Sequence, residues 1–146
     1  MIGNTSKYRS LAMIDPFGMQ VNWKSIEKLK GTKIDLWILI PSGVIINRLL
    51  DKNGKLTHIE KLVSFFGLSE TEIKNHFYKK VIYKDALFDM EDEIQKIPEP
   101  IKKITEVYIQ QLKTIFTYVT LKPLVLLNSR NVPNTILHLR LIILPH

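Results

Sequence analysis

A short apolar run that stops at an acid, a proline, an aromatic and a glycine constrains this chain more than any other stretch. Residues Ser10 to Ile14 carry no charge and have the length of a strand, and Asp15-Pro16-Phe17-Gly18 follows directly. An apolar run bounded by such breakers is typical of a buried strand of a parallel sheet. Open α/β sheets bind ligands at the carboxyl ends of these strands. We therefore expect Asp15 to mark the candidate site.

A second apolar run completes a strand, helix and strand unit. Apolar residues recur at helical spacing between positions 21 and 29, with Asn22 as a candidate N-cap and Gly31 at the C′ position. Ile34 to Ile40 then form a near-continuous apolar run that Pro41-Ser42-Gly43 closes. A strand, helix and strand within roughly 30 residues form a βαβ unit. We expect the two strands to be parallel and the crossover to be right-handed.

Two matching start signals predict helices in the middle of the chain. Thr57 with Glu60, and Ser69 with Glu72, have the spacing of a capping box, in which a hydroxyl and a carboxylate each satisfy an amide of the first turn. Residues 84–98 are mixed and acidic, so we expect a loop with a short helix there. Residues 51–98 are therefore interpreted as a helical insertion. The apolar stripe expected on the first helix ends at Gly67 and comprises Ile59, Leu62, Val63 and Phe66.

The last third of the chain predicts one long helix and two strands. Pro98-Glu99-Pro100 suits a first helical turn, where the missing proline amide is not needed. Strands are expected over 117–127, interrupted by Pro123, and over 136–144. With a short helix over Val44 to Leu50, the pattern is a single partial α/β domain over residues 1–146. It divides into a βαβα core over 8–50, the insertion over 51–98, and a long helix plus terminal strands over 99–146.

The basic composition favours an anionic partner. The chain has 21 Lys and Arg against 14 Asp and Glu, a net charge of +7 and a pI near 9.6. Arg48, Lys102, Lys103 and Lys113 are the candidates for holding the phosphates of a nucleic acid. A salt bridge to Asp51 is the alternative for Arg48, and an ordinary solvated surface is the alternative for the lysines.

Several other kinds of site have no support in the sequence. Without cysteine there is no disulfide framework, thiolate metal site or cysteine nucleophile. The four histidines lack the paired spacing of a metal site, and no histidine and acid are placed to activate Ser42 as a nucleophile. Neither a signal peptide nor an apolar run of about 20 residues is visible, so we expect a cytoplasmic protein without a membrane partner.

The chemistry of the Asp15 motif suits a planar amine. A carboxylate and a backbone carbonyl can accept hydrogen bonds from an exocyclic amino group, while an aromatic ring stacks on the face of a base. Trp23 and Trp37 are interpreted as packing residues, the latter on an inner strand. For Asp15 the alternative is a strand-end acid that caps the following turn, and for Phe17 it is packing in the core.

The same motif resembles the one that Rossmann-fold methyltransferases of amino groups carry after their fourth strand, and its Asp-Pro-Phe-Gly form resembles tRNA guanine dimethyltransferases. Its context resembles, in order and spacing, the three-Cys-motif partner protein family over roughly residues 8–132. The matching segments are 14–23, 34–41, 47–50, 65–67, 77–78, 108–116 and 124–130.

This resemblance implies an α/β fold with an incomplete Rossmann-like (methyltransferase-type) parallel sheet, a helical insertion and C-terminal strands. It implies methyl transfer from S-adenosylmethionine to an amino group, with a nucleic-acid base as the acceptor. Asp15 and the Pro16 carbonyl would orient the amine, and Phe17 would stack on the base. The implied partner is a three-Cys-motif protein, itself similar to radical SAM enzymes and encoded nearby, often in phage-like or mobile elements.

Two departures from the family qualify these expectations. The amino-terminal half that would hold S-adenosylmethionine has no counterpart, since no G-x-G is present, and residues 134–146 depart from the family pattern. We therefore expect a fragment that binds no cofactor and is inactive alone. Its open sheet edge should also make it poorly soluble. The alternative is a non-catalytic interaction module that binds a three-Cys-motif partner or DNA or RNA.

Overall fold

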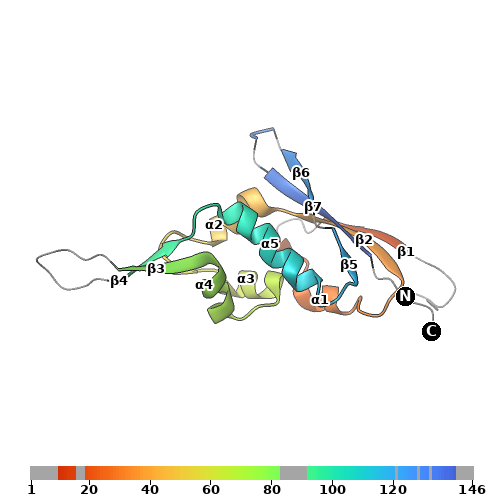
Figure 1. The fold of residues 1–146 in the computed structure, drawn as a ribbon, viewed down its shortest axis with the longest axis horizontal. Coiled ribbons are helices and arrows are strands. Elements are labelled where there is room, and N and C mark those ends of the chain that lie inside the picture. The colour runs from red at the N-terminus through yellow and green to blue at the C-terminus, as the bar shows by residue number, and fades with distance from the viewer. Residues whose placement is uncertain are drawn as a thin grey trace, which may run out of the picture.

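The computed structural model describes residues 10–15, 19–82, 92–120, 122–127, 129–131 and 133–140, the last range by its backbone. Figure 1 shows the elements along the chain. They are β1 (Ser10–Ile14), α1 (Trp23–Glu27), β2 (Ile34–Ile40), the π-helix η2 (Ser42–Ile46), α2 (Asn47–Leu49), α3 (Ile59–Phe66), α4 (Glu70–Phe77), β3 (Tyr78–Ile82), β4 (Asp92–Lys96), α5 (Pro100–Leu112), β5 (Tyr118–Val119), β6 (Leu124–Leu127) and β7 (Pro133–Arg140).

The βαβ unit forms as the sequence predicts. β1 and β2 pair in parallel, from Ser10 opposite Ile34 to Ile14 opposite Ile38, and α1 connects them. Asn22 is the N-cap of α1, since its Oδ1 accepts a hydrogen bond from the Ser25 amide at 2.9 Å. The prediction of two parallel strands is confirmed, and both strands have the predicted bounds.

The rest of the sheet is antiparallel, so the fold is mixed α/β. The strand order is β1-β2-β7-β5, and β6 also pairs with β7. β7 runs antiparallel to β2 on one side and to β5 and β6 on the other. The expectation of a parallel sheet therefore holds for β1 and β2 only. Pro123 lies between β5 and β6, where it interrupts the strand as predicted.

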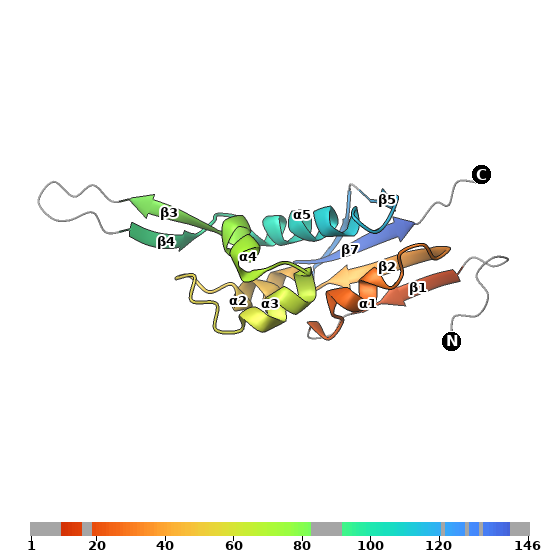
Figure 2. The ribbon, with the colours of Figure 1, turned by 90° about the horizontal axis from the view of Figure 1, so that it is seen from below.

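The helices cover one face of this sheet. In Figure 2, α1 and α5 lie along the strands of the sheet. Alternate residues of β2, namely Ile34, Leu36, Ile38 and Ile40, point to this inner face and are at most 6% exposed. The residues between them point to the opposite, outer face. β2 is an inner strand of the sheet, as expected, but Trp37 is 40% exposed on its outer face, so the interpretation of Trp37 as a packing residue is wrong.

An aromatic cluster forms the centre of the core between α1, α3, α4 and α5. Phe65 stacks on Tyr108 with ring centroids 4.7 Å apart, and Trp23 meets Tyr108 edge-on at 5.8 Å. The apolar stripe predicted for α3 is partly wrong, because Val63 is 36% exposed whereas Phe65 is fully buried. The π-helix and α2 also replace the single short helix predicted over 44–50.

Only one of the two predicted capping boxes forms. Ser69 Oγ accepts from the Glu72 amide at 3.3 Å, and Glu72 Oε2 accepts from the Ser69 amide at 2.8 Å. α3 instead begins after His58 with no side-chain cap, so the box predicted for Thr57 is wrong. Glu60 Oε1 lies 3.8 Å from His58 Nδ1.

The Glu72 cap predicts a pH dependence of stability. Hydrogen bonds from Ser69 lower the pKa of the Glu72 carboxyl from its ordinary value of 4.5. Since the folded chain holds the ionised form better than the unfolded chain does, this stabilisation is present above the unfolded pKa and is lost as pH falls through the lowered one. Thermal unfolding of the chain and of Glu72→Gln should therefore differ at neutral pH and converge in acid. Glu60→Gln is the matched control. A difference in thermal stability between the chain and Glu72→Gln that persists in acid would contradict a stabilising role for the ionised Glu72 cap.

A small hairpin, β3 and β4, replaces part of the predicted helical insertion. Tyr78 pairs with Lys96 and Ile82 with Asp92, so residues 92–96 form a strand where a loop with a helix was expected. Residues 84–91 of that segment lie outside the described residues. Tyr78 Oη donates to the Asp51 carbonyl at 2.8 Å.

Lys96 ties the hairpin to both ends of α2. Its Nζ donates to the Asn47 carbonyl at 2.8 Å, to Asn47 Oδ1 at 2.6 Å and to the Leu50 carbonyl. Burial of the ammonium group lowers the pKa of Lys96, and the nearby Asp51 opposes that shift. The hairpin is thus anchored to the segment that follows β2.

Candidate functional site

Asp15 directly follows β1 and is exposed. Because β1 and β2 are parallel, their carboxyl ends meet at the same edge of the sheet. The residues that follow β2, Pro41 and Ser42, therefore lie at the edge that carries Asp15. Pro16 and Phe17, the other two predicted site residues, lie outside the described part of the chain. A solvent-accessible carboxylate at this edge can accept hydrogen bonds from an amine.

A π-helix begins at the same edge. Ile46 N donates to the Pro41 carbonyl at 3.5 Å, which closes the wide turn, and Ser42 at its start is fully buried. Short π-helical turns occur frequently at functional sites. In the sequence, Pro41-Ser42-Gly43 indicates only the end of the strand. The β-branched run that follows Gly43 gave no signal of the wider helix.

The four predicted phosphate-binding cations are spread over two helices. Arg48 is exposed on α2, and the described structure shows no ion pair between Arg48 and Asp51. The Asp51 carboxylate accepts a hydrogen bond from the Lys55 amide at 2.9 Å. Lys102 lies 4.0 Å from Glu99, and Lys103 lies 3.9 Å from Glu106.

Lys113 lies at the opposite end of α5 from the other two lysines. At 1.5 Å per residue, it is about 16 Å along the axis from Lys102. Two of these lysines therefore have carboxylate neighbours, and the three do not form one compact patch. A nucleic acid would have to follow the length of α5 to contact them all.

An open groove of about 720 Å³ lies between α1 and the α3–α4 corner. Its charged side chains are Lys24, Glu27, Glu60 and Glu70. Glu27 accepts a hydrogen bond from Trp23 Nε1 at 3.0 Å, and Glu70 pairs with Lys74 at 2.6 Å. These carboxylates thus hold structural partners. Asp15 does not line this groove, so the groove is separate from the candidate site.

The described glycines with a positive φ angle do not lie where a loop that binds S-adenosylmethionine would. Each described glycine with a positive φ angle ends a helix or shapes a turn: Gly31 follows α1, Gly67 follows α3, and Gly54 lies in the turn before α3. None of them follows a strand of the sheet, as a glycine loop for a methyl donor would. No group of three metal-ligating side chains gathers in the described part of the chain. Nor does any described helix have the length and apolar character needed to cross a membrane.

Comparisons with protein-family models, curated proteins and solved structures find no match to this chain. The site is therefore defined by its own geometry. That geometry consists of an exposed carboxylate at the end of β1 and a buried serine at the start of a π-helix after β2.

Proposed function

We propose that this chain is the acceptor-binding part of a methyltransferase-like protein of the three-Cys-motif partner type. The full-length parent would transfer a methyl group from S-adenosylmethionine to an amino group, with a nucleic-acid base as the acceptor. The observation that supports this most is the exposed Asp15 at the carboxyl end of β1 in a parallel pair of strands. Such strand ends are where open α/β sheets bind ligands.

The role of Asp15 follows from its chemistry. Its carboxylate would accept a hydrogen bond from an N–H group of the acceptor and so fix the orientation of the amine. Pro16 would add a second acceptor through its carbonyl, and Phe17 would stack on the base. Arg48, on the helix that follows β2, would contact a phosphate. Because no described glycine forms a donor loop, the chain alone is expected to be inactive.

Calorimetric titration with S-adenosylmethionine tests the proposal. We expect no binding heat with this chain alone and a clear heat with a version that carries the upstream half of a family member. Binding by the long form only would support an acceptor-binding part. Absence of binding by both forms would overturn the methyltransferase proposal.

Two substitutions at Asp15 test its role in the long form. Asp15→Ala removes the acceptor oxygens and should lower kcat/KM for methyl transfer to RNA or DNA by about a hundredfold, as the loss of one orienting hydrogen bond typically does. Asp15→Asn keeps a carbonyl oxygen and should retain most of the activity. The measurement is transfer of labelled methyl groups to the nucleic acid. Equal losses in the two variants would contradict a role as hydrogen-bond acceptor.

The second candidate function is a non-catalytic interaction module. The observation that favours it is the apolar outer face of the sheet, where Leu11 and Met13 are 74% and 72% exposed. A three-Cys-motif protein or a nucleic acid would be the partner. Binding of a nucleic acid through the lysines should weaken steeply as salt is raised.

A further inference from the structure

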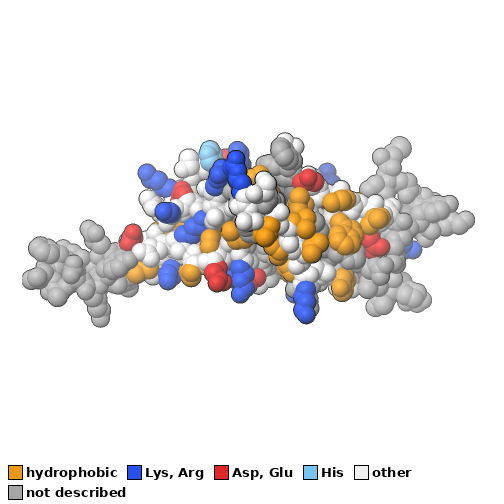
Figure 3. All heavy atoms as spheres, turned by 90° about the horizontal axis from the view of Figure 1, so that it is seen from above, with side chains coloured by type: hydrophobic (Ala, Val, Ile, Leu, Met, Phe, Trp, Pro, Cys, Tyr) orange, Lys and Arg blue, Asp and Glu red, His pale blue; other side chains and the backbone are white. Residues whose placement is uncertain are grey.

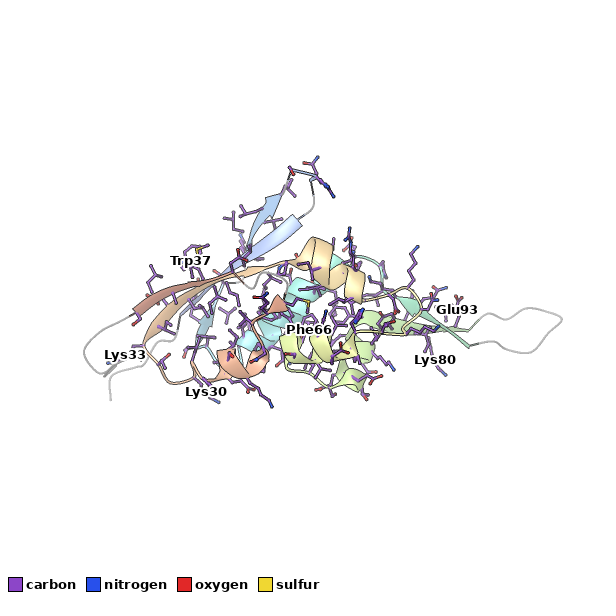
Figure 4. The ribbon with its side chains drawn as sticks, turned by 180° about the vertical axis from the view of Figure 1, so that it is seen from behind. Lys30, Lys33, Trp37, Phe66, Lys80 and Glu93 are labelled. Atoms are coloured by element: carbon purple, nitrogen blue, oxygen red, sulfur yellow. The ribbon has the colours of Figure 1, made fainter. Side chains whose placement is uncertain are left out.

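Almost half of the net positive charge lies in one short segment, α1 and the turn that follows it. Residues 24–33 contain four lysines against one glutamate, which gives +3 of the chain's net +7. Lys24, Lys28 and Lys30 are exposed, whereas Lys33 is half-buried. Figure 4 shows Lys30 and Lys33 at the end of the molecule opposite the β3–β4 hairpin. We call Lys24, Lys28 and Lys30 the α1 lysines.

The α1 lysines have no carboxylate partner in the part of the chain that the structure describes. Glu27 is the acid of the segment, and its Oε1 accepts a hydrogen bond from Trp23 Nε1 at 3.0 Å. Lys24 also borders the groove between α1 and the α3–α4 corner, and no ion pair joins it to the carboxylates there. Lys24 and Lys28 lie four positions apart, where two like charges on a helix repel each other. A bound anion would relieve this repulsion.

The surroundings of the α1 lysines fit a soluble polyanion better than a lipid surface. A helix that binds a membrane surface inserts its apolar side into the lipid. The apolar residues of α1, Trp23 and Ile26, are only 5% and 1% exposed because they pack in the core. Figure 3 shows the other side of the molecule, where hydrophobic side chains gather over the strands and basic side chains lie around them. The α1 lysines thus have no exposed apolar side of their helix beside them.

We infer that the α1 lysines bind the phosphate backbone of a nucleic acid. Contacts from lysine to phosphate supply the sequence-independent part of such binding and fix its register. α1 leads from the carboxyl end of β1 back to the amino end of β2, so Lys24 lies toward the edge that carries Asp15. A backbone bound along α1 would therefore approach that edge. The choice of a nucleic acid rests on the proposed function, whereas the binding itself requires no methyl transfer.

The salt dependence of binding tests the inference. The full chain is titrated into a labelled DNA duplex and a labelled single-stranded RNA, and fluorescence anisotropy is measured at several salt concentrations. On the duplex, three phosphate contacts contribute about 2.7 to the slope of log Kd against log salt, which is a roughly fortyfold loss of affinity between 50 and 200 mM. The triple variant Lys24→Gln/Lys28→Gln/Lys30→Gln should lower the slope by this amount. A slope near zero for the unmodified chain overturns the inference.

A second triple variant, Lys52→Gln/Lys55→Gln/Lys79→Gln, is the matched control. It removes the same charge from exposed positions outside the α1 lysines, so it should leave the slope nearly unchanged. An equal loss of slope in the two triple variants would show that only net charge matters, and this result overturns the inference. Binding to vesicles that contain an anionic lipid, without binding to either nucleic acid, overturns it as well.

Acetylation of the unmodified chain keeps the test independent of variants that fold poorly. Bound DNA or RNA should slow acetylation of the α1 lysines and leave Lys52 and Lys79 unchanged, as measured by mass spectrometry. Equal protection of all these lysines, or protection of none, contradicts the inference.

Neither measurement uses S-adenosylmethionine, so the inference and the proposed function can fail separately. If the α1 lysines bind nucleic acid but the long form transfers no methyl group, the proposed function fails and the inference holds. If the long form methylates nucleic acid equally well with and without the α1 lysines, the inference fails and the proposed function holds.

Discussion

Gly67→Ala is expected to lower the free energy of unfolding by about 3 kcal/mol, as the sum of backbone strain and overpacking. Gly67 is the C-cap of α3, with φ of 67°, and its amide donates to the Val63 carbonyl at 2.9 Å. An added Cβ would lie 2.1 Å from Trp23 Cδ1 and 2.2 Å from Cγ. Trp23 cannot retreat easily, because its ring packs against Tyr108 and its Nε1 is bound to Glu27.

Gly31→Ala separates the cost of backbone strain from the cost of overpacking. Gly31 has a φ of 80°, but an added Cβ would meet nothing within 4 Å, so only the backbone cost of about 1 kcal/mol remains. Urea unfolding of both variants measures the difference. The double variant Trp23→Leu/Gly67→Ala should lose less than the sum of its two single variants. If Gly67→Ala and Gly31→Ala lower the free energy of unfolding equally, the contact between the added Cβ and Trp23 does not contribute to the loss.

Tyr108→Ala is expected to cost about 4 kcal/mol, the usual loss when a large buried aromatic side chain is removed. Tyr108 on α5 is fully buried and joins the helices that pack on the sheet. Its ring contacts Phe65 at 4.7 Å, Trp23 at 5.8 Å and Phe66 at 6.2 Å. The loss can be measured as a shift of the urea midpoint.

Tyr108→Phe, in contrast, should not lower the stability of the chain. The Tyr108 hydroxyl is buried without a hydrogen-bond partner among the described residues, and burial raises its pKa. Removing an unsatisfied polar group relieves its desolvation cost, so stability should stay constant or rise by about 1 kcal/mol. A clear loss of stability in Tyr108→Phe would mean that the hydroxyl has a partner.

The elements that the sequence predicted correctly are those with strong local signals. β1 and β2 are apolar runs between breakers, α4 starts at a capping box, and α5 starts at Pro100. Each signal acts within one turn of helix or one strand. The parallel pairing of β1 and β2 followed because one helix joins them, and a short crossover of this kind leaves few alternatives.

Features that depend on distant pairing were not predictable in the same way. β4, with the sequence Asp-Glu-Ile-Gln-Lys, is too polar to be recognised as a strand, and it forms because it pairs with β3. The antiparallel insertion of β7 likewise depends on residues far from β2. The exposure of Trp37 was missed because an unbroken apolar run does not indicate which of its faces meets the core.

The position of Asp15 in the fold was predicted, whereas its role in binding stays a prediction. Asp15 lies at the carboxyl end of β1, which the apolar run and its breakers indicate directly. The grouping of the cations could not be inferred, because charge counts do not give positions in space. The length of α5 separates Lys102 from Lys113, and Arg48 lies on a different helix.

The position of β7 in the sheet has a consequence for the order of folding during synthesis. β7 pairs with β2 on one side and with β5 and β6 on the other, so a late segment of the chain closes the middle of the sheet. Everything between positions 40 and 133 must be synthesised first, which takes roughly 5 to 20 s at typical translation rates. During that interval the edge of β2 is open to other strands. Nascent chains on neighbouring ribosomes can pair there, so the yield of correctly folded protein should depend on how closely ribosomes follow one another.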